Sequence, residues 1–167
     1  MSKAEQAIDP QKFREVMATW PTGVSIITSM SDENRPVGIL CNSLTSISLA
    51  KKLLLWTVDH SSGSYAHWEK AGKWAVHFLA DNQQELVDRF ARKGVPDKFA
   101  GLDYQLSEFG NPILNGAVAR LECRTTERYE TFDHTIVLGE VIAMNSTGHS
   151  PMIFAYSKFH KGPKRPS

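Results

Sequence analysis

The strongest constraint on the fold is a pair of long β-type runs, residues 117–130 and 133–145, which only Thr131 and Phe132 separate. Two such runs with a two-residue connection predict a hairpin of long antiparallel strands. Shorter runs rich in β-branched and apolar residues predict further strands at residues 23–30, 37–42, 52–59, 73–80 and 151–160. Helical spacing and capping residues predict helices at residues 10–20, 64–72 and 83–94. Because these elements do not follow a β-α-β rhythm, the pattern favours a mainly β (α+β) fold, a small antiparallel barrel with short helices at its ends.

The chain is expected to form a single domain over residues 1–167. Its 167 residues suffice for one sizeable core, and the sequence contains no internal repeat, low-complexity region or linker. Residues 95–116 are expected to be loop-rich. A short flexible N-terminus and a basic C-terminal tail, "HKGPKRPS", are expected at the two ends.

Composition argues against several classes of partner. The formal net charge is +1, so neither a nucleic acid nor a membrane is expected to bind through bulk charge. The N-terminus lacks the apolar core of a signal peptide, and no apolar run approaches the roughly 18 residues that span a membrane. We therefore expect a cytoplasmic protein. Cys41 and Cys123 have no second Cys or close His at metal spacing, so we expect small buried side chains and no metal site, with a single disulfide left open.

Familiar catalytic motifs are absent, and polar segments at strand ends take their place. There is no phosphate-binding P-loop, no dinucleotide-binding glycine motif, no zinc-protease motif and no nucleophile elbow. Three polar segments instead lie beside apolar strands: "PTG" (21–23), "NSLTSIS" (42–48) and "HSSGS" (60–64). Each alone reads as turn and cap residues. Together, their hydroxyl and backbone N–H groups suit a phosphate and a hydrogen-bonding ring system.

A few titratable residues could assist such a site. His134 opens a strongly β-type run, and Asp133 precedes it. Because neighbours on a strand point to opposite faces, a Ser-His-Asp triad built on these two is not expected. His77 lies in an apolar strand and is expected to be a core or ligand-lining group. Four basic residues surround Phe90 and Phe99, and they form either a solvated helix face or a phosphate contact: Arg89, Arg92, Lys93 and Lys98.

Five segments together carry a resemblance to a known family. They are "FREVMATWPTGVSIITS", "RPVGILCNSLTSISL", "WTVDHSSGSYAHWEKAGKWAVHFLA", "LVDRFARKGVPDKFAG" and "GNPILNGAVARLECRTTERYETFDHTIVLGEV". In this order and spacing they resemble the flavin reductase family, the short-chain NAD(P)H:flavin oxidoreductases that supply reduced flavin to two-component monooxygenases. The resemblance covers about residues 12–160. It implies an antiparallel, Greek-key split β-barrel that binds FMN or FAD, usually as a homodimer with the flavin near the subunit interface.

The resemblance also implies roles for particular residues. The segments around Thr22 and Asn42 are expected to bind the isoalloxazine and ribityl groups, and the "HSSGS" segment the phosphate. His134 is expected on the nicotinamide side, as a helper and not as an essential acid or base. The expected flavin-binding residues are Thr22, Gly23, Asn42, Ser43, Leu44, Thr45, Ser61, Ser62, Ser64, His77, Phe78, Phe90, Lys98 and Phe99.

The implied activity agrees with the residue types at hand. Hydride transfer from NADH or NADPH to a flavin needs stacking, distance and exclusion of water, because the cofactor carries the chemistry. FMN is slightly favoured over FAD, and NADH over NADPH. Two alternatives remain open: a pyridoxamine-phosphate-oxidase-like oxidase or a tetrapyrrole-handling protein on the same barrel, and a flavin-binding protein without reductase activity. Phe132 stands where relatives often have Gly, and we expect it to narrow access for the nicotinamide.

Overall fold

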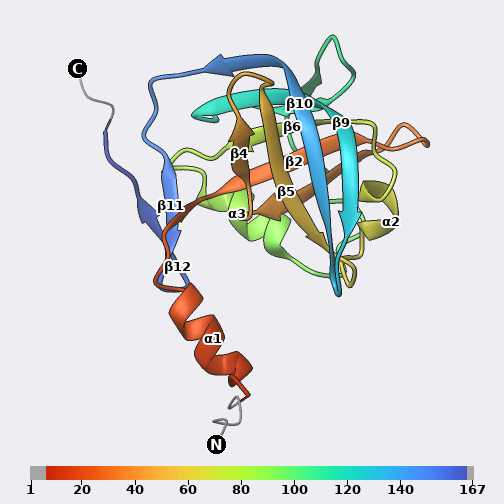
Figure 1. The fold of residues 1–167 in the computed structure, drawn as a ribbon. Coiled ribbons are helices and arrows are strands. Elements are labelled where there is room, and N and C mark those ends of the chain that lie inside the picture. The colour runs from red at the N-terminus through yellow and green to blue at the C-terminus, as the bar shows by residue number, and fades with distance from the viewer. Residues whose placement is uncertain (1–6, 165–167) are drawn as a thin grey trace, which may run out of the picture.

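The computed structural model describes residues 7–164, so the first and last residues of the predicted flexible ends lie outside the described part. Every strand pair in residues 7–164 is antiparallel (Figure 1). The strands are β1 (Thr22–Gly23), β2 (Ser25–Met30), β3 (Pro36–Cys41), β4 (Thr45–Ser48), β5 (Leu53–Asp59), β6 (Lys73–Phe78), β7 (Tyr104–Leu106), β8 (Pro112–Leu114), β9 (Ala119–Glu130), β10 (His134–Ser146), β11 (Met152–Ala155) and β12 (Lys158–Lys161). The helices are α1 (Pro10–Met17), α2 (Tyr65–Trp68) and α3 (Gln84–Ala91). The predicted mainly β class with short helices is confirmed.

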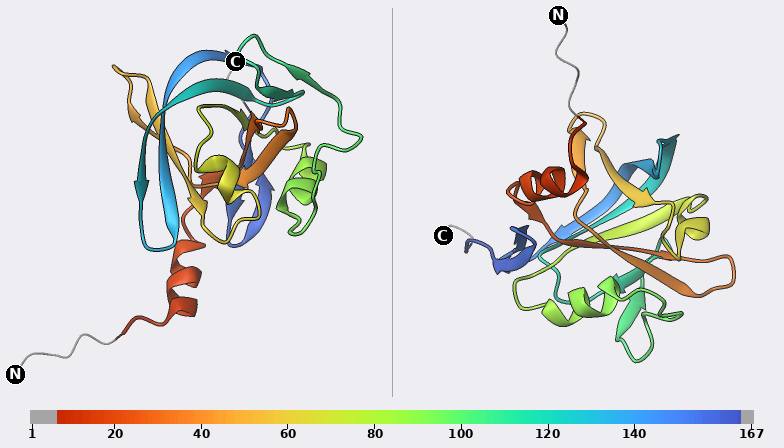
Figure 2. Two further views of the ribbon diagram at one scale, coloured as in Figure 1. Left: turned by 90° about the vertical axis from the view of Figure 1, so that its right-hand side faces the viewer. Right: turned by 90° about the horizontal axis from the view of Figure 1, so that it is seen from below.

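One curved sheet forms the body of the protein. Its seven strands follow the order β3-β2-β6-β9-β10-β5-β4, and a three-stranded sheet, β1-β11-β12, stands beside it (Figures 1 and 2). β5 precedes β6, β9 and β10 in the chain but lies beside β10, which is a Greek-key arrangement. β3 and β4 are the two edges of the sheet and do not pair with each other. The strands therefore curl as a split barrel and do not close by hydrogen bonding.

The central hairpin follows the sequence pattern closely. β9 and β10 pair along nearly their whole length, with bulges between Leu138 and Gly139 and between Val141 and Ala143. Gly139 permits close packing, because a Cβ atom there would lie 2.5 Å from the Trp74 ring. Trp74 belongs to one of two core clusters and meets Trp56 edge to face, with ring centroids 5.8 Å apart. The inner face of the sheet is thus filled by large rings.

Two hairpins near the ends of the fold differ from the expectation. The segment 95–116, expected to be loop, contains the β7–β8 hairpin. The single strand expected at residues 151–160 is the hairpin β11–β12. Tyr156 and Ser157 make its turn with φ of 50° and 58°, so two residues without the usual turn preference reverse the chain.

Helix α1 stands away from the sheet (Figure 1). It begins as predicted, with Asp9 accepting a hydrogen bond from the Gln11 N–H at 3.1 Å and Pro10 in the first turn. None of its residues is buried. Four large apolar side chains on and just beyond it are at least half exposed: Phe13, Val16, Met17 and Trp20.

Both cysteines are buried free thiols, as expected from the apolar runs that contain them. Burial raises the pKa of each thiol, so neither is a ready nucleophile. Across residues 7–164, no helix is both long enough and apolar enough to cross a membrane.

Candidate flavin and nicotinamide site

Most of the predicted polar site residues lie next to strand β5, either opposite it in the sheet or in the segments before and after it. In an antiparallel sheet, residues directly opposite each other share a face. Thr45 of β4 is opposite Leu55, and His134 of β10 is opposite Asp59 at the other end of the same strand. The intervening residue Trp56 points inward and is fully buried. The segment expected to bind the ring and the histidine expected beside the nicotinamide therefore belong to one wall of the split barrel, formed by β4, β5 and β10.

The connection from β3 to β4 is fastened to β5 through Ser43. Its Oγ accepts a hydrogen bond from the Thr57 N–H at 3.0 Å and lies 3.3 Å from the Cys41 Sγ. Leu44 packs against the tryptophan cluster. Asn42 and Thr45 are exposed on either side of this anchor. The connection therefore keeps its apolar residue inside and leaves two polar side chains open to a ligand.

The loop after β5 is ordered by its own side chains. The Asp59 Oδ1 accepts a hydrogen bond from the Ser61 N–H at 2.7 Å, and the Asp59 carbonyl accepts one from the Ser62 N–H at 3.0 Å. Hydrogen bonding from Ser61 lowers the pKa of Asp59, and nearby positive groups act in the same direction. The hydroxyls of Ser62 and Ser64 lie 3.3 Å apart, and Ser64 also accepts from the Trp68 indole at 3.0 Å. The backbone N–H of Ser61 is thus bonded to Asp59 while its side chain is exposed, and Ser62 and Ser64 form the hydroxyl pair of the loop.

Thr135 fixes this loop to β10. Its hydroxyl is 3.1 Å from the His60 Nε2 and 2.9 Å from the Tyr65 hydroxyl. His60 and Tyr65 also pack together, with ring centroids 4.7 Å apart. Thr135 is almost completely buried, so this anchor is shielded from water. The loop and His134 are held at the same end of the wall.

The tip of the β9–β10 hairpin corrects one expectation. Asp133 and His134 were expected to point apart, but the Asp133 Oδ1 lies 2.8 Å from the His134 Nδ1. The alternation rule does not apply, because β10 begins at His134 and Asp133 belongs to the turn. Phe132, at the same tip, is fully exposed.

His77 is a core residue in this structure. Its side chain is fully buried; its Nδ1 is 3.2 Å from the Ile26 carbonyl, and its Nε2 accepts a hydrogen bond from the Leu114 N–H at 3.1 Å. Burial lowers the pKa of His77 to about 4, so the ring is neutral near pH 7. Of the two interpretations left by the sequence, core group and ligand-lining group, the geometry favours the first, because no part of the ring is open to a ligand.

Phe90 and Phe99 also fill the core, and Lys98 also stabilises the end of α3. The two phenylalanine rings meet edge to face with centroids 5.2 Å apart, and both are buried in the second core cluster. The Lys98 Nζ donates to the Phe90 carbonyl at 2.6 Å, which fastens the end of α3. Burial lowers the pKa of Lys98. Phe78, also expected at the flavin, is half-buried at the end of β6.

Thr22 has a hydroxyl without a hydrogen-bond partner in residues 7–164, and Gly23 has open space beside its Cα. The Thr22 Oγ1 is shielded from water and has no hydrogen-bond partner within residues 7–164. An unpaired buried hydroxyl is costly and commonly marks an absent partner. A Cβ atom at Gly23 would meet nothing within 4 Å. Thr22 and Gly23 belong to the separate three-stranded sheet, whereas Asn42, Thr45 and the hydroxyl pair of the loop lie beside β5. By chemistry all of them suit a flavin, which offers ring heteroatoms, ribityl hydroxyls and a phosphate.

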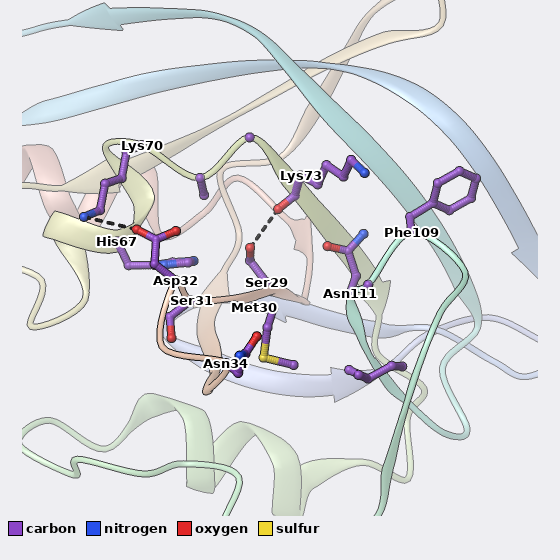
Figure 3. Close-up of a pocket in the computed structure, with 14 residues that line it drawn as sticks. Ser29, Met30, Ser31, Asp32, Asn34, His67, Lys70, Lys73, Phe109 and Asn111 are labelled. Carbon is purple, nitrogen blue, oxygen red and sulfur yellow. Dashed lines mark hydrogen bonds and ion pairs between the residues drawn. The ribbon is translucent and has the colours of Figure 1, made fainter.

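Two hollows in the surface of residues 7–164 lie away from these residues. The larger, of about 470 Å³, is bounded by the β2–β3 turn, α2 and the residues before β8 (Figure 3). The Lys70 Nζ is 3.6 Å from the Asp32 Oδ2 at this hollow. A second hollow of about 270 Å³ lies beside the start of α3. None of the predicted site residues lines either hollow, and residues 7–164 hold no group of three or more side chains suited to a metal ion.

The sequence interpretation missed the apolar part of the wall. Leu55, Ile136 and Leu138 share the outer face with Thr45 and His134 and are only half-buried in the isolated chain. The available signal was that β5 and β10 contain consecutive apolar residues, at 53–56 and 136–138, which indicates strand segments covered on both faces. The wall therefore presents an apolar strip between its two polar ends.

Comparisons with known proteins place the chain in a family. Residues 17–163 match the family model described as "Flavin reductase like domain". A flavin reductase from Pseudomonas putida is 44% identical over 135 residues, which cover 81% of this chain and 79% of that protein. The reductase subunit of a flavin-dependent monooxygenase from Rhodococcus jostii is 38% identical over 152 residues, covering 90% of this chain and 77% of the relative.

A solved structure agrees with these matches. The NADH:FAD oxidoreductase of Streptomyces globisporus, solved with NAD and FAD fragments, superposes with a TM-score of 0.84 and 33% identity. The superposition covers 93% of this chain and 95% of that one. The family model spans most of the chain, and the two relatives and the solved structure are each more than 30% identical to it over more than three quarters of both chains. The chain therefore belongs to the flavin reductase family.

Proposed function

We propose that the protein is an NADH-dependent flavin reductase that supplies reduced flavin to a separate monooxygenase. The observation that carries the proposal is the family match over residues 17–163, joined to a wall whose polar groups fit a flavin and whose His134 end also fits a nicotinamide. The names of the relatives, a monooxygenase reductase subunit and an NADH:FAD oxidoreductase, support the donor and the partner. They favour a reductase over the oxidase and over the binding-only protein.

The residues would divide the work of holding the flavin. Asn42, Thr45 and the unpaired Thr22 hydroxyl would hydrogen-bond the ring and ribityl chain, and Ser62 with Ser64 would meet the phosphate. Of the four basic residues that form either a solvated helix face or a phosphate contact, Arg92 and Lys93 are exposed and would add positive charge if the second holds. A bound flavin supplies the hydride acceptor, so the chain needs to bind, orient and exclude water.

The test is anaerobic reduction. We expect purified protein mixed with excess FMN or FAD to bleach the flavin band at about 450 nm when NADH is added, over many turnovers. NADPH in place of NADH, and FMN against FAD, then rank the substrates by kcat/KM. Flavin binding without bleaching by either nucleotide would contradict the reductase and favour a binding-only protein.

His134 is proposed to assist the nicotinamide without being essential. We expect His134→Ala to lower the rate of flavin reduction by about tenfold, because one positioning contact is lost while the flavin still carries the chemistry. Stopped-flow reduction by NADH at saturating flavin measures this rate. His149→Ala removes an exposed histidine bonded to the Gly116 carbonyl and serves as the control. Equal rates in His134→Ala and the unsubstituted protein would remove the role.

We also propose that the protein acts as a homodimer in the cytoplasm. The homodimer is supported by α1 and the residues just after it, which leave Phe13 59% and Trp20 70% exposed, and by the half-buried apolar strip on the outer wall. An isolated two-turn helix is unstable in water unless another surface covers its apolar face.

A charge on that helix should weaken the dimer. We expect the unsubstituted protein to show twice the chain mass in sedimentation equilibrium. Phe13→Glu should raise the dimer dissociation constant about thirtyfold, since it places a charge in an apolar contact worth about 2 kcal/mol. Gln11→Glu adds the same charge on the opposite face of α1 and should leave the constant unchanged. A monomeric unsubstituted protein would refute the dimer.

A further inference from the structure

We infer that Asp133 is a positioning residue that holds the His134 imidazole with Nδ1 protonated and so presents Nε2 as a hydrogen-bond acceptor. The group that Nε2 would accept from is the carboxamide N–H of the nicotinamide nucleotide. The inference rests on the proposed function for the identity of this ligand. Its geometry rests only on contacts in the hairpin tip.

The contact between the two side chains sets the tautomer. The Asp133 Oδ1 lies 2.8 Å from the His134 Nδ1. A carboxylate only accepts hydrogen bonds, so Nδ1 must carry the proton, and in the neutral ring Nε2 is then a lone-pair acceptor. Within the described chain Nε2 has no hydrogen-bond partner, and the His134 side chain is 40% exposed. In the His134 ring, Nδ1 is thus hydrogen-bonded to Asp133, and Nε2 is available to a ligand.

The backbone beneath this pair is held on both sides. The Thr131 hydroxyl donates to the His134 carbonyl at 2.7 Å, and the Thr131 N–H donates to the same oxygen at 2.8 Å. The His60 N–H donates to the Asp133 carbonyl at 2.9 Å. Two adjacent residues of an exposed hairpin tip are therefore fixed relative to each other and to the loop expected at the flavin phosphate. The backbone of the tip therefore loses little conformational entropy when a ligand meets Nε2.

The other nearby carboxylate, Asp59, makes no hydrogen bond to the ring within residues 7–164. Asp59 lies opposite His134 across the β5–β10 pair, but its Oδ1 accepts from the Ser61 N–H. Asp133 is thus the carboxylate that contacts Nδ1. An imidazole without such a partner prefers the proton on Nε2 and would offer a donor in place of an acceptor. Asp133 therefore decides which end of a carboxamide the histidine can recognise.

The first test reads the tautomer directly and needs no activity. Long-range ¹H–¹⁵N spectra of histidine-labelled protein, above neutral pH, separate protonated from unprotonated ring nitrogens. The His134 signals are those lost in His134→Ala. We expect protonated Nδ1 in the unsubstituted protein and a shift towards protonated Nε2 in Asp133→Ala. Glu140→Gln, which removes one negative charge from the far half of β10, should change nothing. A proton that stays on Nδ1 in Asp133→Ala would overturn the inference.

The second test asks what Nε2 recognises. The 3-acetylpyridine analogue of NADH keeps the carbonyl of the carboxamide and lacks its N–H groups. We expect the ratio of kcat/KM for NADH to that for the analogue to fall about three- to tenfold in Asp133→Ala, the worth of one hydrogen bond. The intrinsic reactivity of the analogue cancels, because each ratio is compared between two forms of one protein.

The outcomes separate the inference from the proposed function. A changed tautomer with an unchanged ratio would overturn the recognition of the carboxamide. No reduction of flavin by any form would refute the reductase, while the spectra would still decide whether Asp133 positions His134.

Discussion

Replacing Glu122 by leucine should lower the free energy of unfolding by about 3–5 kcal/mol, the cost of breaking a buried ionic group by removing one partner. Glu122 is 1% exposed in the middle of β9. Its carboxylate accepts hydrogen bonds from the Ser107 hydroxyl and from the Asn111 amide, the latter at 3.1 Å, and lies 3.7 Å from the Arg120 Nε. Leucine has a similar volume but leaves these donors without their acceptor, and Asn111 is only 2% exposed, so water cannot replace the lost carboxylate there.

Urea denaturation measures this change, and the β7–β8 hairpin reports where it acts. Since Ser107 and Asn111 flank the turn of that hairpin, its amide hydrogens should exchange faster in Glu122→Leu. Glu140→Gln breaks a second Glu–Arg pair, with Arg124 at 3.2 Å, whose side chains are 37% and 62% exposed. This control should cost at most about 1 kcal/mol. Equal losses in the two variants would contradict the argument from burial.

His77 should make the protein sensitive to acid. The unfolded chain takes up a proton on this ring near its ordinary pKa of about 6.5, whereas burial, with a smaller contribution from the Arg120 charge, lowers the pKa in the folded state to about 4. Between these values the unfolded state binds more protons, so the free energy of unfolding falls as the pH falls. The stability is complete above pH 6.5; the loss is about 2 kcal/mol by pH 5 and about 3 kcal/mol below pH 4.

Two variants isolate this contribution from that of the carboxylates. His77→Gln and His77→Asn do not titrate, so urea denaturation at about pH 8 and about pH 5 should show a loss smaller by about 2 kcal/mol than in the unsubstituted protein. Asparagine is too short to serve both the Ile26 carbonyl and the Leu114 N–H, so it should be the less stable variant at the higher pH. The same pH dependence in all three forms would refute the role of His77.

The fold was readable where a pattern was long and local. The β9–β10 pair spans two extended β-type runs, and its hairpin was predicted within a few residues of its observed ends. The β7–β8 hairpin was missed because its stability depends on Glu122, a residue of another strand, and no local pattern reports that contact. The β11–β12 turn was missed because Tyr156 and Ser157 take positive φ without glycine or asparagine.

The residue types of the candidate site could be predicted from the sequence, but the contacts of some of its side chains could not. The polar segments around Asn42 and Ser62 were recognised as a potential site, and the register of β5 explains how they share one wall with His134. Phe90 was expected near the flavin, but an apolar residue that lines a ligand and one that fills a core look alike in sequence. The Asp133–His134 contact was excluded by a strand rule that stops applying one residue before the strand begins.

Strands β5 and β10 carry core residues on one face and site residues on the other, and this limits which insertions the protein can tolerate. Trp56 fills the interior while its neighbours Leu55 and Thr57 face outward, so one added residue in the middle of β5 would exchange the two faces beyond it. The tryptophan core and the polar ends of the wall would fail together. The bulge beside Gly139 is different, because the β9–β10 register already changes there. Changes in chain length among descendants of this sequence should therefore collect at such bulges and at the loops, and β5 should keep its length.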